Sequence, residues 1–429
     1  METIKLPKNY LLYGSLIGLF GGLLLGIIAE TQNIRLFYAI LSFIEPLGTL
    51  WINSLRMIVL PLIIAYIITA VASFSEIKST FKVGGGAIFA HLVYLGIGFT
   101  VMIALVPHLV TFYNVTPELT QAIQFTSVET PQPSGTTEAP TGLRNIIVNI
   151  IPVNLFSAAA NNEILPLFVA ALLFGLALTR VPQQQRRMVV SFFKAIISVL
   201  YVLIQWILMV MPYAVFILVF SMASQAGSQL LGALIFFVVL FCGLLLFATL
   251  LLYVVTPIVG RVSLRKFAQS SLPAQTVAIG SRSSMVCLPA LIEGAKDRLG
   301  LPEKIVGLVM PLAVSMFKYN KVVSGPIQIF FLAHIYGIQL EPWALVAFFM
   351  AYIPTSFSSP GIPSGGFFVS LPLYIALGIP VEGVVLLRTV DAIPDIFKTI
   401  ANVTEDMSVA ALVSRYSAES ATSLSPLPD

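Results

Sequence analysis

The sequence predicts an all-α polytopic membrane protein, and three observations support this fold class. Hydrophobic residues make up 58% of the 429 residues, charged residues only 10%, and the mean hydropathy is +0.95. A soluble globule of this size needs more polar surface than that. Apolar runs long enough to cross about 30 Å of hydrocarbon at about 1.5 Å per residue recur along the chain. After residue 265 these runs are interrupted in a repeating pattern.

Six apolar runs in the first 260 residues predict six membrane spans. The first run is long and lacks a small-residue cleavage site, so we interpret it as a retained helix and not as a signal peptide. The predicted spans cover residues 11–30, 37–73, 83–112, 145–179, 189–223 and 228–259.

Basic residues occur in alternate loops and thereby indicate an orientation. The positive-inside rule makes these loops cytoplasmic and places the amino terminus inside, and we expect the carboxyl terminus to be cytoplasmic as well. The short loops are typical of a protein of a prokaryotic inner (plasma) membrane. Residues 114–143 contain three Glu and no Lys or Arg, which predicts a long external loop. The net charge of +4 comes from basic residues in the loops and indicates no nucleic-acid partner. The basic loop residues are Lys5, Lys8, Lys78, Lys82, Arg180, Arg186, Arg187, Arg261, Arg265 and Lys266.

Two apolar segments in the second part of the chain are each interrupted by a small-residue tip. Residues 267–294 are interrupted at residues 281–284, and residues 352–377 at residues 358–366. A helical hairpin with an unwound tip is tolerated inside a membrane only where its backbone lines a cavity or binds a ligand. The full span at 305–332 between them is itself broken by Lys318-Tyr319-Asn320-Lys321. A hairpin followed by a helix, repeated twice, is typical of inverted-repeat transporters.

A polar stripe follows near the carboxyl end of an otherwise apolar segment. At about 100° per residue its members share roughly one quarter of a helix circumference. A carboxylate inside a membrane needs a cation, so we expect Asp395 to face either a ligand ammonium or Lys398. The stripe consists of Asp391, Asp395, Lys398, Asn402 and Asp406, with Thr399 beside it.

The sequence contains no recognisable catalytic or metal-binding pattern. The three histidines, His91, His108 and His334, show no ligand spacing, and we interpret Cys242 and Cys287 as buried thiols. No nucleotide-binding loop or catalytic triad pattern occurs, so we expect no enzyme, no cofactor and no metal site.

These motifs resemble the glutamate transporter family of dicarboxylate/amino acid:cation symporters, and the resemblance covers essentially the whole chain. The last-helix pattern is its most specific part. The motifs that carry it are Glu45-Pro46-Leu47-Gly48, Arg56-Met57, Leu60-Pro61-Leu62, Ile151-Pro152-Val153-Asn154, Asn161, Leu165-Pro166, Arg282-Ser283-Ser284, Leu288-Pro289, Gly361-Ile362-Pro363, Gly366, Asp391, Asp395, Thr399, Asn402 and Asp406.

The resemblance implies eight transmembrane helices and two re-entrant hairpins in a lipid-embedded homotrimer. A fixed scaffold would carry a mobile transport domain that moves like an elevator, with the second hairpin as its gate. The implied divisions are scaffold helices 1 and 2 at 1–80, transport-domain helix 3 at 81–114, an external loop at 115–143, scaffold helices 4 and 5 at 144–227, the rest of the transport domain at 228–416 and a cytoplasmic tail at 417–429.

The resemblance also implies the substrate site. In family members the residue matching Asp395 holds the substrate amino group, and those matching Thr399 and Asn402 hold polar backbone groups of the substrate. The residues matching Asp391 and Asp406 lie in or beside the ion sites. The expected substrate-binding residues are Arg282, Ser283, Ser284, Lys321, Ile362, Gly366, Asp395, Lys398, Thr399 and Asn402.

The seventh-helix break departs from the family pattern. Where family members have Asn-Met-Asp-Gly-Thr, this chain has Phe317-Lys318-Tyr319-Asn320-Lys321. Lysine ammonium groups repel a hard cation that needs oxygen ligands, so we expect sodium coupling to be lost or changed. A lysine could act as a tethered cation, and Glu405 beside Asp406 could carry protons. The expected ion-site or tethered-cation residues are Lys318, Tyr319, Lys321, Asp391, Glu405 and Asp406.

A second departure concerns substrate choice. Lys398 replaces the family arginine that binds an acidic side chain; it keeps the charge but loses the bidentate geometry. Lys321 could supply the missing contact. If both lysines are engaged by Asp391 and Asp395, a neutral amino acid fits instead. We therefore predict a secondary transporter of acidic amino acids with sodium-independent or altered coupling; the alternatives are a neutral amino acid or dicarboxylate transporter, or a non-transporting sensor.

Overall fold

The computed structural model describes residues 10–32, 35–74, 81–116, 119, 151–160, 164–357 and 365–422. Within these ranges the regular structure is helical and no strand occurs, which confirms the all-α prediction. The helices of the first part are α1 Tyr10–Gln32, α2 Arg35–Phe74, α3 Phe81–Val110, α6 Leu155–Ala160, α7 Ile164–Leu178 and α8 Gln183–Gly260. Those of the second part are α9 Leu264–Ser281, α10 Leu288–Glu293, α11 Glu303–Met316, α12 Lys321–Tyr336, α13 Pro342–Tyr352, α14 Gly365–Ala376, α15 Val381–Thr389 and α16 Pro394–Thr422.

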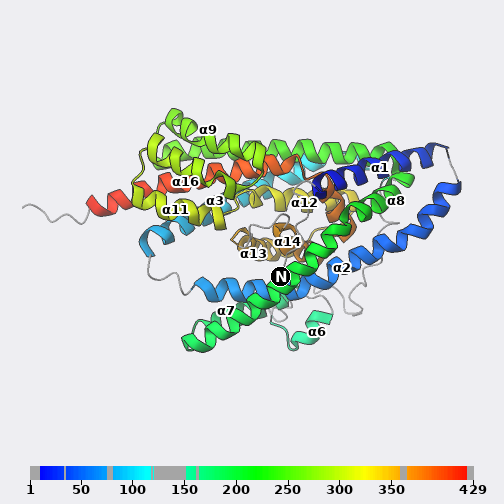
Figure 1. Ribbon diagram of the computed structural model, residues 1–429, viewed down its shortest axis with the longest axis horizontal. Coiled ribbons are helices and arrows are strands. Elements are labelled where there is room, and N and C mark those ends of the chain that lie inside the picture. Colours follow the sequence, from blue (N-terminus) through cyan, green and yellow to red (C-terminus); the bar gives the residue numbers. More distant parts are fainter. Residues whose placement is uncertain are drawn as a thin grey trace, which may run out of the picture.

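Helix α8 contains a sharp reversal at Gly227. The backbone there has φ 47° and ψ −125°, a conformation that favours glycine. A Cβ at this position would lie 1.8 Å from Oε2 of Glu30, so the close approach of α1 also requires glycine. Figure 1 shows the two halves of α8 as separate rods, the second of which runs back toward α9. The predicted spans at 189–223 and 228–259 are therefore distinct helices.

The described helices include five that are long and apolar enough to cross a membrane. Four shorter apolar helices accompany them. The polytopic character expected from composition is thus matched by helix lengths. The five long segments are Ala39–Thr69, Gly84–Val110, Gln183–Ile207, Gln229–Gly260 and Glu303–Tyr336.

The first predicted hairpin and the helix break after it are confirmed. Helix α9 ends at Ser281, a 3-10 turn covers Ser284–Cys287, and α10 continues into a π-helical turn at Gly294–Arg298 that packs back on α9. Helix α11 ends at Met316 and α12 begins at Lys321. Pro273 and Pro311 inside these helices are tolerated because the helices are packed against neighbours.

The second hairpin is built from α13, the 3-10 turn Ile353–Ser356 and α14. Its first arm begins at Pro342, ten residues before the predicted start at Tyr352. Most of the expected tip, residues 358–364 with Ile362, lies outside the described residues, while Gly366 is in the first turn of α14. The predicted external loop, residues 115–143, also falls almost entirely outside them.

Helix α16 lies in the interior of the second half of the molecule. It packs against α3, α8, α9 and α11, and Figure 1 shows its red ribbon beside α9 and α11. Residues 401–413 are all buried. Polar side chains on this stretch are therefore removed from solvent, and each needs a hydrogen-bond partner within the protein to offset the lost hydration.

Candidate functional site

The break between α11 and α12 is held directly by α16. Oδ1 of Asn402 accepts a hydrogen bond from the backbone N–H of Asn320 at 2.8 Å and another from its side-chain amide at 3.1 Å. The hydroxyl of Ser324 donates to the Asn320 carbonyl at 2.9 Å. These bonds satisfy backbone groups that unwinding would leave unpaired. In this structure Asn402 supports the break, while the substrate contact expected of it stays a prediction.

The tip of the first hairpin carries Arg282 in a left-handed conformation, with φ 50°. This conformation is uncommon for a residue other than glycine and marks a position held by its surroundings. The neighbouring Ser283 N–H donates to Ser281 Oγ at 3.3 Å, and Ser284 begins the next turn. The Arg282 charge acts on Asp395 of α16, so the tip and the α16 carboxylate face one site.

Asp391 is the centre of a buried ion-pair cluster. It ion-pairs with Arg388 of α15 and with Lys398 of α16. The Lys398 ammonium also lies 5.0 Å from the ring centroid of Phe241 in α8. Two positive side chains thus neutralise one carboxylate that is 7% exposed. The cations tethered to Asp391 are Arg388 and Lys398, and neither belongs to the seventh-helix break.

The prediction that five polar residues form one stripe on the last helix is wrong in one respect, because Asp391 lies before that helix. Helix α16 begins at Pro394, and Asp391 lies in the turn before it, where its carbonyl accepts the Asp395 N–H at 2.9 Å. The turn allows the Asp391 side chain to reach both α15 and Lys398. As a result Lys398 pairs with Asp391, and no described residue forms a side-chain hydrogen bond or ion pair with the Asp395 carboxylate.

Lys321 begins α12 and points into the second hairpin. Its Nζ donates to Ser370 Oγ of α14 at 2.8 Å and lies 4.8 Å from the ring centroid of Tyr352. The charges of Arg388 and Lys398 also act on it. Lys321 therefore joins the helix break, the second hairpin and the Asp391 cluster. The Thr399 hydroxyl, one turn into α16, donates to the Asp395 carbonyl at 2.9 Å.

A second pair of acids lies deeper in the protein. Oε1 of Glu405 is 2.9 Å from Nδ1 of His91 in α3, and both side chains are fully buried. This contact was missed because 314 positions separate the two residues and His91 has no metal-ligand spacing. The available signal was a lone ionisable residue inside an apolar span, which is a site candidate by default.

Asp406 has a different environment from its neighbour Glu405. It is fully buried, and neither carboxylate oxygen has a hydrogen-bond partner among the described residues. Lys318 interacts with both acids through its charge, but its Nζ donates to the Val314 carbonyl at 2.8 Å. Lys318 is thus near Asp406 without forming an ion pair with it. Tyr319, also predicted here, packs edge-on against Tyr94.

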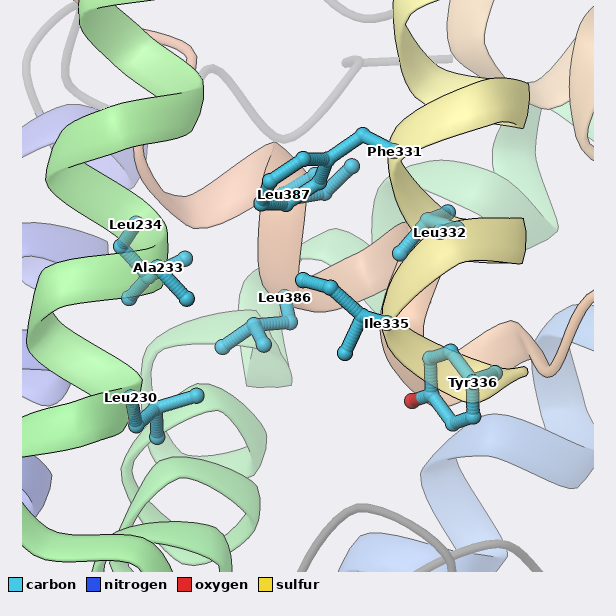
Figure 2. A pocket seen from close by; sticks show the side chains of 9 residues that line it. All are labelled: Leu230, Ala233, Leu234, Phe331, Leu332, Ile335, Tyr336, Leu386 and Leu387. Atoms are coloured by element: carbon cyan, nitrogen blue, oxygen red, sulfur yellow. The ribbon is translucent and has the colours of Figure 1, made fainter. Parts of the chain in front are cut away.

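A small apolar pocket lies away from these polar groups, between α8, α12 and α15. Figure 2 shows its hydrocarbon lining, with the Tyr336 hydroxyl as the polar atom in view. It offers no charged group to an amino acid and is separate from the candidate site. Its lining residues are Leu230, Ala233, Leu234, Phe331, Leu332, Ile335, Tyr336, Leu386 and Leu387.

Comparison with known proteins agrees with this architecture. The model of the sodium:dicarboxylate symporter family matches residues 11–416. The chain belongs to this family. The resemblance inferred from its motifs is thereby confirmed, and this sodium:dicarboxylate symporter homologue is an integral membrane transport protein. Because a symporter moves solutes without converting them, the expectation that the chain is not an enzyme is confirmed as well.

Similar proteins span nearly the same length as this symporter homologue. The proton/glutamate-aspartate symporter of Escherichia coli (strain K12) is 25% identical over 422 residues, which are 97% of this chain and 94% of the relative. The proton/sodium-glutamate symport protein of Bacillus subtilis (strain 168) is 26% identical and covers 94% and 93%. A C4-dicarboxylate transport protein of Cupriavidus necator is 27% identical and covers 87% and 86%.

Proposed function

We propose that the chain is a secondary transporter of acidic amino acids whose coupling does not require sodium. The observation that carries the substrate class is the charge around Asp395. Four basic side chains lie around two carboxylates, Asp391 and Asp395; they are Arg282, Arg388, Lys398 and Lys321. Basic groups therefore outnumber carboxylates, which favours a substrate with a net negative charge, such as zwitterionic aspartate or glutamate.

The two ends of the substrate would bind to different parts of this site. Asp395 is the carboxylate without a side-chain partner among the described residues, so it is the group best suited to an ammonium. Arg282, whose charge acts on Asp395 from the first hairpin tip, and Lys321, whose Nζ reaches Ser370 of the second hairpin, would bind the substrate carboxylates. The names of the Escherichia coli and Bacillus subtilis relatives support this substrate class.

A neutral amino acid is the second candidate, and one observation favours it. Asp391 engages both Arg388 and Lys398, which reduces the charge they can offer to a ligand. A C4-dicarboxylate, the substrate named for the Cupriavidus relative, has no ammonium to occupy Asp395. Competition of labelled aspartate uptake by glutamate, serine and succinate separates the three classes.

Sodium independence is proposed from the residues at the break. Lys318 places its side chain close to Glu405 and Asp406, and Lys321 places an amine close to the Asp391 cluster. Fixed or titratable positive groups at these positions oppose binding of a further cation. We also propose the homotrimer, the elevator movement, and an inner-membrane location with both termini cytoplasmic.

Uptake of labelled aspartate and glutamate into proteoliposomes tests the function. The assay is run with sodium and with sodium rigorously replaced, each with and without a proton gradient. Sodium-free uptake supports the proposal, and strict dependence on sodium contradicts it. Binding of label without its transfer into the vesicle would instead identify a sensor.

Asp395→Asn tests the binding site itself. The variant removes the carboxylate that would hold the substrate ammonium, and we expect aspartate affinity to fall at least about 100-fold, as about 2.7 kcal/mol for a charged hydrogen bond implies. Since no side-chain hydrogen bond or ion pair of Asp395 to a described residue is lost, elution and thermal unfolding should match those of the unmodified protein. Undiminished binding would remove Asp395 from the site.

A further inference from the structure

We propose that His91 and Glu405 form a proton-binding pair whose occupancy is transmitted through Ser356 to the second hairpin. The pair would take the proton that drives or regulates transport, so the inference rests on the proposed function. Neither residue contacts the Asp395 site. The argument depends on which atoms face the two nitrogens of the His91 ring.

The His91 ring is held in one orientation by aromatic neighbours. It stacks on Phe317 with centroids 4.3 Å apart and planes 7° apart, and Phe357 meets it edge-on at 5.0 Å. Phe317 belongs to the break after α11, and Phe357 follows the first arm of the second hairpin. With the plane fixed in this way, Nδ1 points to Glu405 and Nε2 to Ser356 Oγ at 3.4 Å.

Both nitrogens of His91 face hydrogen-bond acceptors when Glu405 is ionised. The hydroxyl of Ser356 donates its hydrogen to the Ile353 carbonyl at 2.7 Å, so its oxygen presents lone pairs toward His91. A neutral imidazole donates from one nitrogen, whereas an imidazolium donates from both. An ionised Glu405 therefore matches a His91 that carries two protons.

A second arrangement fits the same contacts and has the same number of protons. A protonated Glu405 can donate to Nδ1 while a neutral His91 donates from Nε2 to Ser356. In either arrangement the pair holds two protons, so the inference does not depend on the tautomer. Loss of one proton leaves two sets of lone pairs facing each other, either at Ser356 or at Glu405.

The structure connects loss of that proton to the second hairpin. To avoid the repulsion, the Ser356 hydroxyl must turn from Ile353 to donate to Nε2, or the ring must withdraw from Ser356. Either change alters a contact at the end of the hairpin's first arm, beside Phe357. The side chains of His91, Glu405 and Ser356 are all fully buried, so such a repulsion is costly in the low local dielectric.

Other titratable groups face the pair from each neighbouring element. Tyr94 lies on α3, and Lys318 and Tyr319 lie at the break between α11 and α12; all three interact with Glu405 through charge. Asp406 is the neighbour on α16. Among the described residues of the second hairpin, the polar group that contacts the pair is the hydroxyl of Ser356. Lys318 lies near both acids, and its Nζ donates to the Val314 carbonyl at 2.8 Å.

Hydrogen exchange of the second hairpin at different pH values tests this link without any need for transport. The unmodified full chain is compared at pH 6 and pH 8, with intrinsic exchange rates corrected, over peptides from residues 342–357 and 365–376. We expect protection to fall at least about fivefold at pH 8, since proton activity changes about 100-fold over this range. Absence of any pH effect in the unmodified protein would overturn the proposal.

Two variants test whether the pH effect on hydrogen-exchange protection arises at the His91–Glu405 pair and Ser356. H91Q removes the titrating ring, and S356A removes the acceptor outside the pair; both should reduce the pH effect on protection to less than about twofold. H334Q is the matched control, because His334 Nε2 contacts one acceptor, the Tyr113 carbonyl, at 2.8 Å. It should behave like the unmodified protein. Retention of the full pH effect in S356A or in H91Q would overturn the proposal, and S356A decides if H91Q does not fold.

Uptake measurements keep this proposal distinct from the proposed function. In sodium-free vesicles with equal internal and external pH, H91Q should lose the pH dependence of aspartate uptake while retaining aspartate affinity. If the unmodified protein transports no acidic amino acid, the proposed function fails, but the exchange experiment still judges the pair. If transport is normal and H91Q keeps the same pH profile, the pair is refuted and the function stands.

Discussion

Two acidic clusters near the carboxyl end differ in how their charge is balanced. In the first, which we call the fixed cluster, Asp391 ion-pairs with Arg388 and Lys398. In the second, which we call the titratable cluster, Glu405 contacts His91, and Asp406 has no hydrogen-bond partner among the described residues. The first cluster balances its carboxylate with two basic side chains, whereas the second would hold the exchangeable proton of the proposal above.

This difference assigns different tasks to the two clusters, which are a few helical turns apart along α16. The fixed cluster ties α15 to the start of α16 and sets the charge beside Asp395. The titratable cluster connects α16 to α3 and to the end of the first arm of the second hairpin. In the proposed sodium-independent transporter, the first cluster would keep the binding site in place and the second would load and release a proton.

Asp391→Asn should have the largest effect, because it breaks the fixed cluster. It leaves Arg388 and Lys398 facing each other without their carboxylate in a poorly hydrated site. We expect a loss of about 3 kcal/mol in the free energy of unfolding, with loss of uptake. Thermal unfolding in detergent measures the change. An unfolding midpoint equal to that of the unmodified protein would show that the cluster does not stabilise the fold.

Lys398→Gln should have an intermediate effect. Arg388 remains paired with Asp391, so the carboxylate is not left uncompensated. We expect a loss of about 1 kcal/mol and an unchanged pH profile of uptake, because no titratable contact is removed. The comparison with Asp391→Asn under the same conditions is the control. A loss as large as that of Asp391→Asn would mean that Lys398 alone carries the cluster.

Asp406→Asn should have the smallest effect on stability. The replacement has nearly the same shape, and no hydrogen bond or ion pair of Asp406 to a described residue is lost. We expect a change within about 0.5 kcal/mol, typical of a substitution that removes no specific contact. Chemical unfolding measures it beside Asp391→Asn. Destabilisation by several kcal/mol would show that the two clusters are equally structural.

Much of the architecture could be predicted from local sequence. The hydrophobic runs correspond to helices in the structure. The serine-rich tip at 281–284 and the lysine-containing break at 318–321 lie where helices end. These features are local, because a run of polar or small residues disrupts an apolar helix wherever it occurs. The polar stripe was predicted for the same reason, although the turn before Pro394 removes Asp391 from it.

Local sequence patterns therefore specified the fold class, the family, the helix breaks and the identity of the acidic residues. The packing of the helices determined which basic group pairs with which acid. Lys398 pairs with Asp391 and not with Asp395, and His91 pairs with Glu405 across 314 positions. The physical reason is that a helical pattern specifies which side chains share a face, but not which helix lies opposite. Ion pairs between helices depend on how the helices pack, and packing is a property of the whole chain.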